Sequence, residues 1–151
     1  MKITKTFKWE MGHRLTFHKG LCWNLHGHSY RMKVSVEGPL NKNGMVIDFY
    51  DLTQIFKKVV NEPLDHAFMC YEKDSFVSVL REWDQPMEED DLSTLRKFKY
   101  VIVPFETTAE NITKYLFKLF NKEIIKVTKG RCKVNRVKVY ETESSEAVYY
   151  G

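Results

Sequence analysis

The first part of the chain alternates apolar and polar side chains with the two-residue period of half-buried strands. Odd positions are mostly apolar from Ile3 to Met11, and even positions are apolar from Tyr30 to Val36. These patterns predict a strand over residues 3–13 and a second strand that begins near residue 26 and ends at residues 38–39. The turn sequence at residues 41–44 predicts that the segments on either side of it pair as a hairpin.

Two later stretches have helical spacing. Apolar residues between Leu52 and Val59 predict a helix that begins near Asp48 or Asp51 and ends at Pro63. A capping-box sequence at residues 107–110 predicts the start of a second amphipathic helix that continues through residue 119. Residues 72–98 are charged and irregular, which indicates a solvated excursion with room for a short helix.

Short runs complete the pattern: a β-branched strand at residues 100–103, a strand around residues 137–141, a turn at residues 144–145 and a last strand at residues 147–150. The order strand, strand, helix, strand, helix, strand, strand predicts an α+β fold. Strand pairs joined by short turns favour an antiparallel sheet with two helices on one face. The length of 151 residues fits a single domain over residues 1–151.

Composition limits the class of protein. Hydrophobic residues make up 43% and charged residues 29%, as in soluble globular proteins. The start of the sequence has no signal-peptide apolar region, and no stretch approaches the roughly 20 apolar residues of a membrane span, so we expect a cytoplasmic protein without a membrane partner. Three cysteines argue against a disulfide framework.

The net charge of +4 is compatible with an anionic partner. Lys and Arg residues are scattered along the sequence, and such diffuse charge favours a small phosphorylated substrate about as well as it favours nucleic acid. The sequence contains no basic stripe with interleaved aromatic residues, which argues against a nucleic-acid binder.

The segment His26-Gly27-His28 carries the strongest chemical signal. At the head of a strand, residues two apart project on the same side, about 6.6 Å from one another. His13 ends the neighbouring predicted strand, and three neutral imidazoles suit a catalytic zinc ion with one open position. The alternative is that His26 and His28 cap the strand through backbone hydrogen bonds while His13 is a partly buried spacer.

A thiol and an acid–base pair stand near this motif. Cys22 is a potential catalytic thiol, a small buried hydrophobe, or a fourth ligand in a closed structural site. Cys70 and Cys132 have no such neighbours and are expected to be core thiols. Asp65 could set the tautomer and pKa of His66 for proton transfer, although this pairing is also common on loop surfaces.

Two carboxylates have ambiguous positions. Glu110 lies where a capping-box carboxylate would accept a hydrogen bond from the Thr107 amide. Glu141 shares the strand parity of Val137 and Val139, which places it on an apolar side. An inward carboxylate is costly without a partner, and a ligand with two N–H donors would satisfy it.

The ordered motifs resemble those of the 6-pyruvoyltetrahydropterin synthase and 6-carboxytetrahydropterin synthase family. The similarity runs from residue 7 to residue 150, and only residues 72–98 lack a counterpart. Six blocks carry the resemblance: Gly12–Leu15, Cys22 with His26–His28, Gly44–Phe49, Leu64–His66, Thr108–Asn111 and Val139–Thr142.

The resemblance implies the tunnelling fold (T-fold), with a four-stranded antiparallel sheet and two antiparallel helices, assembled as a homohexamer of two trimers. It implies zinc held by the three histidines already named, with active sites between subunits. It also implies proton transfer by Cys22, Asp65 and His66. The pterin ring would be anchored by Glu141, with help from Glu110.

The substrate that the resemblance implies is 7,8-dihydroneopterin triphosphate. Three residues separate Cys22 from His26, which resembles the bacterial carboxy-forming members of the queuosine pathway. We therefore expect 6-carboxy-5,6,7,8-tetrahydropterin, acetaldehyde and triphosphate as products, with pyruvoyl formation by triphosphate elimination as the alternative. A more distant alternative is a non-catalytic, zinc-stabilised binding module. The sequence does not indicate which residues bind the triphosphate, although Arg14 and Lys19 are close to the metal motif.

Overall fold

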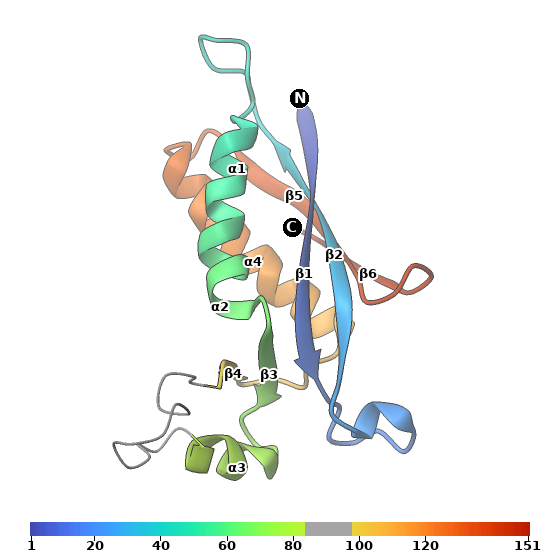
Figure 1. Ribbon diagram of the computed structural model, residues 1–151. Helices are drawn as coiled ribbons and strands as arrows, with labels where there is room; N and C mark the ends of the chain where they lie inside the picture. Colours follow the sequence, from blue (N-terminus) through green and yellow to red (C-terminus); the bar gives the residue numbers. More distant parts are fainter. Residues whose placement is uncertain (84–97) are drawn as a thin grey trace, which may run out of the picture.

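The computed structural model describes residues 1–83 and 98–151, and one six-stranded sheet forms its frame (Figure 1). In spatial order the strands are β4 (Tyr100–Val103), β3 (Ala67–Tyr71), β1 (Lys2–His13), β2 (His26–Glu37), β5 (Lys133–Tyr140) and β6 (Glu146–Tyr150). β1, β2, β5 and β6 are antiparallel, as expected. β3 and β4 add a parallel extension beyond β1.

Strand β3 was not predicted from the sequence. Four of its five residues are buried, so it has no apolar–polar alternation. Parallel strands covered on both faces have this continuous apolar pattern. The predicted strand at residues 100–103 is confirmed as β4, and it pairs with β3.

Two helical segments pack antiparallel on one face of the sheet, which we call the inner face (Figure 1). The first comprises α1 (Phe49–Phe56), a wide π-turn (Lys57–Asn61) and α2 (Glu62–Leu64). The second is α4 (Ala109–Val127). Inward side chains of β1, β2 and β5 form the core with these helices. Phe7 of β1 stacks on Phe56, with ring centroids 4.4 Å apart.

The ends of these segments differ in part from the prediction. Asp48 caps α1 as expected, because its side chain accepts a hydrogen bond from the Tyr50 amide. The helical segment continues past Pro63 to Leu64. Proline has no N–H to donate to the carbonyl four residues before it, and the wide π-turn accommodates this gap.

Two other sequence predictions are wrong. Residues 45–48 form no strand, so the turn at residues 41–44 does not connect a hairpin. The side chain of Asn41 accepts hydrogen bonds from the amides of Asn43 and Met45 and closes a loop that leads to α1. The N-cap of α4 is Thr108 and not Thr107, since the Thr108 hydroxyl accepts from the Asn111 amide.

Part of the segment 72–98 is a packed helix. α3 (Phe76–Trp83) follows β3, and its Val77 and Leu80 are buried against Phe68 and Cys70 of that strand. The prediction of a solvated excursion is therefore wrong for the start of this segment, and residues 84–97 lie outside the described part. Within the described ranges, no helix is both long enough and apolar enough to cross a membrane.

Candidate metal centre and active site

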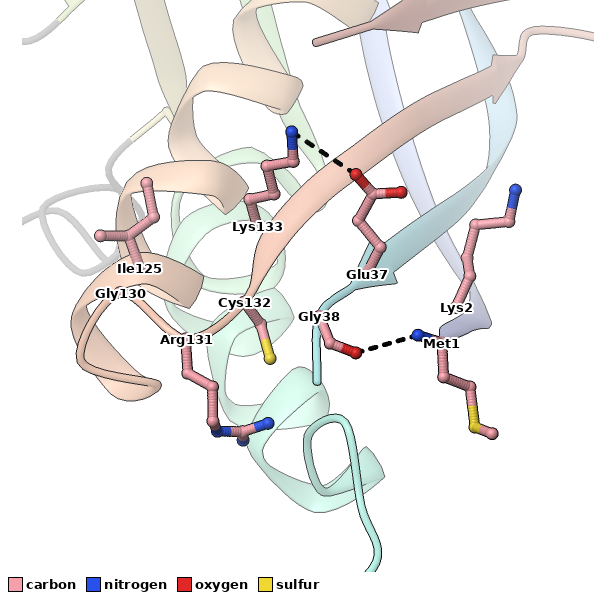
Figure 2. A pocket seen from close by; sticks show the side chains of 9 residues that line it. All are labelled: Met1, Lys2, Glu37, Gly38, Ile125, Gly130, Arg131, Cys132 and Lys133. Atoms are coloured by element: carbon pink, nitrogen blue, oxygen red, sulfur yellow. Dashed lines mark hydrogen bonds and ion pairs between the residues drawn. The ribbon is translucent and has the colours of Figure 1, made fainter. Parts of the chain in front are cut away.

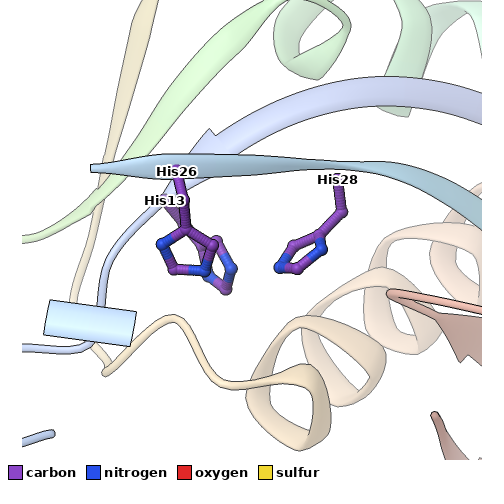
Figure 3. Close-up of side chains that lie close together, drawn as sticks. All are labelled: His13, His26 and His28. Atoms are coloured by element: carbon purple, nitrogen blue, oxygen red, sulfur yellow. The ribbon is translucent and has the colours of Figure 1, made fainter. Parts of the chain in front are cut away.

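The pairing of β1 with β2 places three histidines together. His13 lies directly opposite His26, and Met11 lies opposite His28. All three histidines share the strand parity of the inward core residues. Figure 3 shows their rings on the same side of the two strands, close to the start of α4. Two-residue spacing on β2 and the antiparallel register are therefore sufficient to gather the three side chains.

The cluster has the dimensions of a metal site. Each histidine offers a ring nitrogen, and these three atoms lie within 4.8 Å of one another. Ring centroids are 4.6 Å apart for His13 and His26, 5.2 Å for His13 and His28, and 5.0 Å for His26 and His28. In residues 1–83 and 98–151, no other set of three or more His, Cys, Asp or Glu side chains has this geometry.

Backbone carbonyls set the orientation of two rings. Nδ1 of His13 lies 2.7 Å from the Thr107 carbonyl oxygen, and Nδ1 of His26 lies 2.8 Å from that of Asn24. A carbonyl only accepts hydrogen bonds, so each Nδ1 is the donor and each Nε2 carries a lone pair. Both Nε2 atoms are buried without a hydrogen-bond partner in the described part of the chain. Strand capping accounts for the hydrogen bond of each Nδ1 but leaves each buried Nε2 without a partner. Metal binding accounts for both, because Nε2 would bind the ion while Nδ1 orients the ring.

The environment disfavours protonation of two of the three histidines. The pKa of His13 is lowered to about 4, mainly by burial and also by the charges of His26 and His28, while the Thr107 carbonyl opposes the shift. Burial and His26 also lower the pKa of His28. Neutral imidazole is the form that binds metals, so the donors fit a divalent cation such as zinc.

Two carboxylates border the cluster. Glu141 follows β5 and points inward as its parity predicts, with Oε1 3.8 Å from Nε2 of His13. The Tyr30 hydroxyl donates to the same oxygen at 3.4 Å. Burial raises the pKa of Glu141, the Tyr30 hydrogen bond opposes this effect, and the charge of Glu110 adds to the increase. Glu110 is exposed in the first turn of α4, where it is not the N3 residue of a capping box.

Cys22 belongs to a short 3₁₀ turn (Leu21–Trp23) in the loop that joins β1 to β2. It is partly exposed, whereas Cys70 and Cys132 are buried as predicted, and all three are free thiols. Its backbone carbonyl accepts from the Leu15 amide at 2.8 Å. Cys22 is not part of the cluster that could share an ion, so the described geometry does not support a closed site with a fourth, sulfur ligand.

Arg14 anchors the Cys22 loop. Its guanidinium forms a two-point ion pair with Asp74, with Nε 2.7 Å from Oδ2. The same guanidinium lies over the rings of Trp23, at 4.8 Å, and Phe76, at 5.6 Å. Both charged side chains are largely buried. Arg14 is thus committed to a structural pair that ties the loop to α3, and it is not a free cation for a phosphorylated ligand.

Replacing Asp74 with asparagine should lower the free energy of unfolding by about 3–5 kcal/mol, because it leaves the Arg14 charge buried and unpaired. Asparagine can still accept the Phe76 amide hydrogen bond, so the variant isolates the ion pair. Burial opposes ionisation of Asp74, but Arg14 and the Phe76 amide lower its pKa. The stabilisation is therefore present at neutral pH and lost as pH falls through that lowered pKa.

Urea unfolding at neutral and acidic pH measures this effect. The control is Lys58→Gln, which breaks the exposed pair with Glu123 and should cost at most about 1 kcal/mol. Equal losses of unfolding free energy in the two variants would show that the buried pair contributes no more stability than the exposed pair.

Asp65 and His66 are in contact, as the proposed proton-transfer role requires. Oδ2 of Asp65 lies 3.0 Å from Nδ1 of His66, and Oδ1 accepts from the Glu10 amide at 2.9 Å. Burial opposes ionisation of Asp65, but the Glu10 amide and His66 lower its pKa. His66 has a positive φ of 58°, an uncommon conformation for a residue with a side chain. The exposed ring is thus presented at a fixed position.

His66 does not join the histidine cluster. It lines a pocket of about 420 Å³ with Glu10, Ser29 and Phe68. Glu10 and Ser29 alternate with the inward residues of β1 and β2, so they belong to the opposite, outer face of the sheet. A Cβ added to Gly12 would lie 3.0 Å from the Phe68 ring, which shows how closely this pocket approaches the backbone. His28 also lines this pocket, but His66 is not among the side chains that can share an ion with it.

Two site residues were missed in the sequence. The Thr107 carbonyl orients His13, and a backbone acceptor of this kind leaves no sequence signal. Tyr30 was recognised only as a strand core residue, yet its hydroxyl reaches Glu141. Its position two residues after His28 on the same strand face was the available signal.

A larger pocket of about 690 Å³ lies at the opposite end of β1 (Figure 2). Its charged side chains are mostly engaged: the Met1 amine donates to the Gly38 carbonyl at 3.1 Å, and Lys133 pairs with Glu37 at 3.5 Å. Arg131 donates to the carbonyl of Val46 at 2.6 Å. The polar groups of this pocket hold neighbouring parts of the chain together. The histidine cluster therefore remains the best candidate for a functional site.

Comparisons with known proteins show the family of the chain. A family model described as 6-pyruvoyl tetrahydropterin synthase matches residues 2–151. The 6-carboxy-5,6,7,8-tetrahydropterin synthase of Haemophilus influenzae is 36% identical, with 98% of this chain and 97% of that protein covered.

Solved structures share the fold. An uncharacterised protein from Wolinella succinogenes has a TM-score of 0.81 and 27% identity, with 99% of this chain and 97% of that chain covered. The 6-pyruvoyltetrahydropterin synthase of Plasmodium vivax has a TM-score of 0.68 and 23% identity, with 100% and 98% covered. The second match supports the T-fold architecture that the sequence resemblance implied.

Proposed function

The chain belongs to the 6-pyruvoyl tetrahydropterin synthase family of enzymes, and on this basis we propose that it converts 7,8-dihydroneopterin triphosphate to 6-carboxy-5,6,7,8-tetrahydropterin. Acetaldehyde and triphosphate would be released, and the product would enter queuosine biosynthesis. The observation that carries the proposal is the cluster of three imidazoles, in which two buried Nε2 atoms have no hydrogen-bond partner among the described residues. The name of the Haemophilus influenzae relative favours the carboxy product.

The metal in this proposal is zinc, held by His13, His26 and His28. Zinc with three imidazole ligands keeps an open position, where it acts as a Lewis acid toward substrate oxygens and lowers the pKa of groups bound to it. The carbonyls of Thr107 and Asn24 hold two of the rings in the tautomer that such binding needs.

The remaining roles belong to side chains around the cluster. Cys22 is partly exposed in the loop that joins His13 to His26 and would remove a proton from the substrate side chain as a thiolate. His66, held in one tautomer by Asp65, would return protons. Glu141 would accept hydrogen bonds from N–H groups of the pterin ring, and Glu110 would assist from the first turn of α4.

The proposed active site requires a second subunit. His66 shares its pocket with the outer-face residues Glu10 and Ser29 and is not part of the ion-binding set, so it would act at the cluster of another copy. A homohexamer of two trimers with sites between subunits, as the family resemblance implies, would provide this arrangement. The cytoplasm suits such an enzyme, because all three cysteines are free thiols.

Mixing two inactive variants tests the shared site. Cys22→Ala and His66→Ala should each be inactive alone. If the two residues come from different chains, random reassembly of an equal mixture restores about one quarter of the sites. Pterin product formation after reassembly, with each variant reassembled alone as a control, measures the recovery. If activity stays absent in mixtures whose co-assembly is verified by mass, Cys22 and His66 do not act from different chains.

Product identification tests the function itself. Purified protein with bound zinc is incubated with dihydroneopterin triphosphate, and the pterin product is identified by mass while acetaldehyde is assayed in parallel. The proposal requires the carboxy product and acetaldehyde in equal amounts. A pyruvoyl product without acetaldehyde would support the alternative activity that the family description names. Zinc binding with no turnover would favour a non-catalytic module.

A further inference from the structure

The outer face of the sheet collects basic side chains that are scattered in the sequence. Strand register places Lys8 of β1 directly opposite Arg31 of β2, and Lys33 of β2 directly opposite Lys138 of β5. Arg31 and Lys33 are two residues apart on β2 and therefore share the face. Two cross-strand pairs of like charge thus lie side by side, and such pairs destabilise a sheet.

The protein neutralises only part of this charge. Lys138 forms an ion pair with Glu146 at 2.6 Å. In the described part of the chain, Lys8, Arg31 and Lys33 have no carboxylate within ion-pair distance, and we call these three residues the outer-face triad. The nearby Glu10 carboxylate instead accepts a hydrogen bond from the Ser29 hydroxyl at 2.7 Å. Within the chain, the triad is only partly compensated, because Glu146 interacts with Lys33 as well as with Lys138 but forms its ion pair with Lys138.

Arg31 is held in position for such an anion. Its guanidinium carbon lies 4.2 Å from the centroid of the Tyr140 ring, and the ammonium groups of Lys33 and Lys138 lie 5.8 Å and 5.6 Å from the same centroid. Tyr140 thus fixes the Arg31 side chain without using its N–H groups. A planar guanidinium with free N–H groups binds phosphate oxygens in a two-point contact.

A pocket of about 280 Å³ opens beside the triad. Lys8, Ser29, Arg31 and Tyr140 line it, together with residues 141–143. Two of these lining residues are acids, but Glu141 directs a carboxylate oxygen toward Tyr30 on the inner face, and Glu143 is exposed at the end of the strand. The cationic side of the pocket is therefore formed by Lys8 and Arg31.

We propose that the outer-face triad binds a small polyphosphate anion, of the chemical class of inorganic triphosphate, on the sheet face opposite the histidine cluster. Neighbouring strands are about 5 Å apart and alternate residues about 7 Å apart, so the three side chains start from a compact triangle of backbone positions, within reach of a short chain of phosphates. A nucleic acid would require cations along an extended track. The proposal goes beyond the proposed function and does not depend on turnover.

Calorimetric titration with inorganic triphosphate tests the site in the full chain. The double variant Arg31→Gln/Lys33→Gln should bind about tenfold more weakly or worse, since charge-assisted contacts to phosphate are lost. Lys57→Gln/Lys122→Gln removes the same charge from exposed helix positions and should change the affinity less than about twofold. The single variant Lys8→Gln provides a second, milder substitution in the triad.

Two further titrations test whether triphosphate binds at the histidine cluster instead, and whether the patch prefers a nucleic acid. His26→Ala, which disrupts the histidine cluster, should leave triphosphate binding unchanged. A short single-stranded DNA should bind more weakly than triphosphate at equal ionic strength. The proposal is overturned if wild-type protein does not bind triphosphate, if both double variants lose affinity equally, if His26→Ala abolishes binding, or if the DNA binds more tightly.

Discussion

Replacing Cys22 with alanine is expected to reduce product formation by at least about 10²–10⁴-fold, the usual contribution of a positioned acid or base, while zinc content and fold remain unchanged. The reason is the position of the thiol. Cys22 is partly exposed in the loop beside the cluster, but it is not among the side chains that can share an ion. The measurements are pterin product by mass, zinc per chain by elemental analysis, and thermal unfolding.

Cys132→Ala is the matched control for this experiment. Cys132 is a free thiol that is buried near the other end of the sheet, and its Sγ contacts the Val46 carbonyl at 3.1 Å. This variant should keep both zinc and turnover. If Cys22→Ala instead loses its zinc, the thiol is a ligand, and the assignment of Cys22 to proton transfer is wrong.

Replacing His26 with alanine is expected to remove zinc and, with it, all turnover. Loss of a residue that only orients a metal ligand costs about 10–100-fold in metal affinity, so loss of a ligand should cost more. His26 is the best choice among the three, because it is only partly buried and its removal disturbs the core less than removal of His13. Zinc stoichiometry after dialysis and the activity assay measure the effect.

His18→Ala is the control, since it removes an imidazole from the same loop region. Nδ1 of His18 accepts a hydrogen bond from the Gly20 amide, and this histidine is outside the cluster. The variant should bind zinc like the wild type. Full zinc occupancy in His26→Ala would mean that the metal is held elsewhere or by other ligands.

Local patterns predicted most of the inner layer of the fold. Alternation identified β1 and β2, helical spacing identified α1 and α4, and Asp48 was recognised as a helix start. The failures have physical causes. β3 is buried on both faces and lacks alternation, while the polar turn at residues 41–44 resembles a hairpin but is closed by the Asn41 side chain. α3 begins in a segment whose charge suggested a solvated loop.

The candidate site was also predicted only in part from the sequence. Parity on adjacent strands was enough to bring His13, His26 and His28 together and to turn Glu141 inward, because side-chain direction in a strand follows sequence position. Odd or even position along a strand gave no information about His66, because this residue lies outside the strands and has a positive φ. Its place in a pocket with the outer-face residues Glu10 and Ser29 follows from the parallel pairing of β3 with β1, a long-range contact.

The sequence alone determined the chemistry of this protein: which donors exist, which of them share a strand face, and which family the motifs resemble. Beyond the histidine cluster, only the tertiary structure decided which distant groups meet. It paired Arg14 with Asp74, left His66 outside the ion-binding set, and assembled Lys8, Arg31 and Lys33 into one basic patch. The physical reason is that strand register and sheet order bring together residues far apart in the chain, whereas local periodicity specifies only the direction of each side chain.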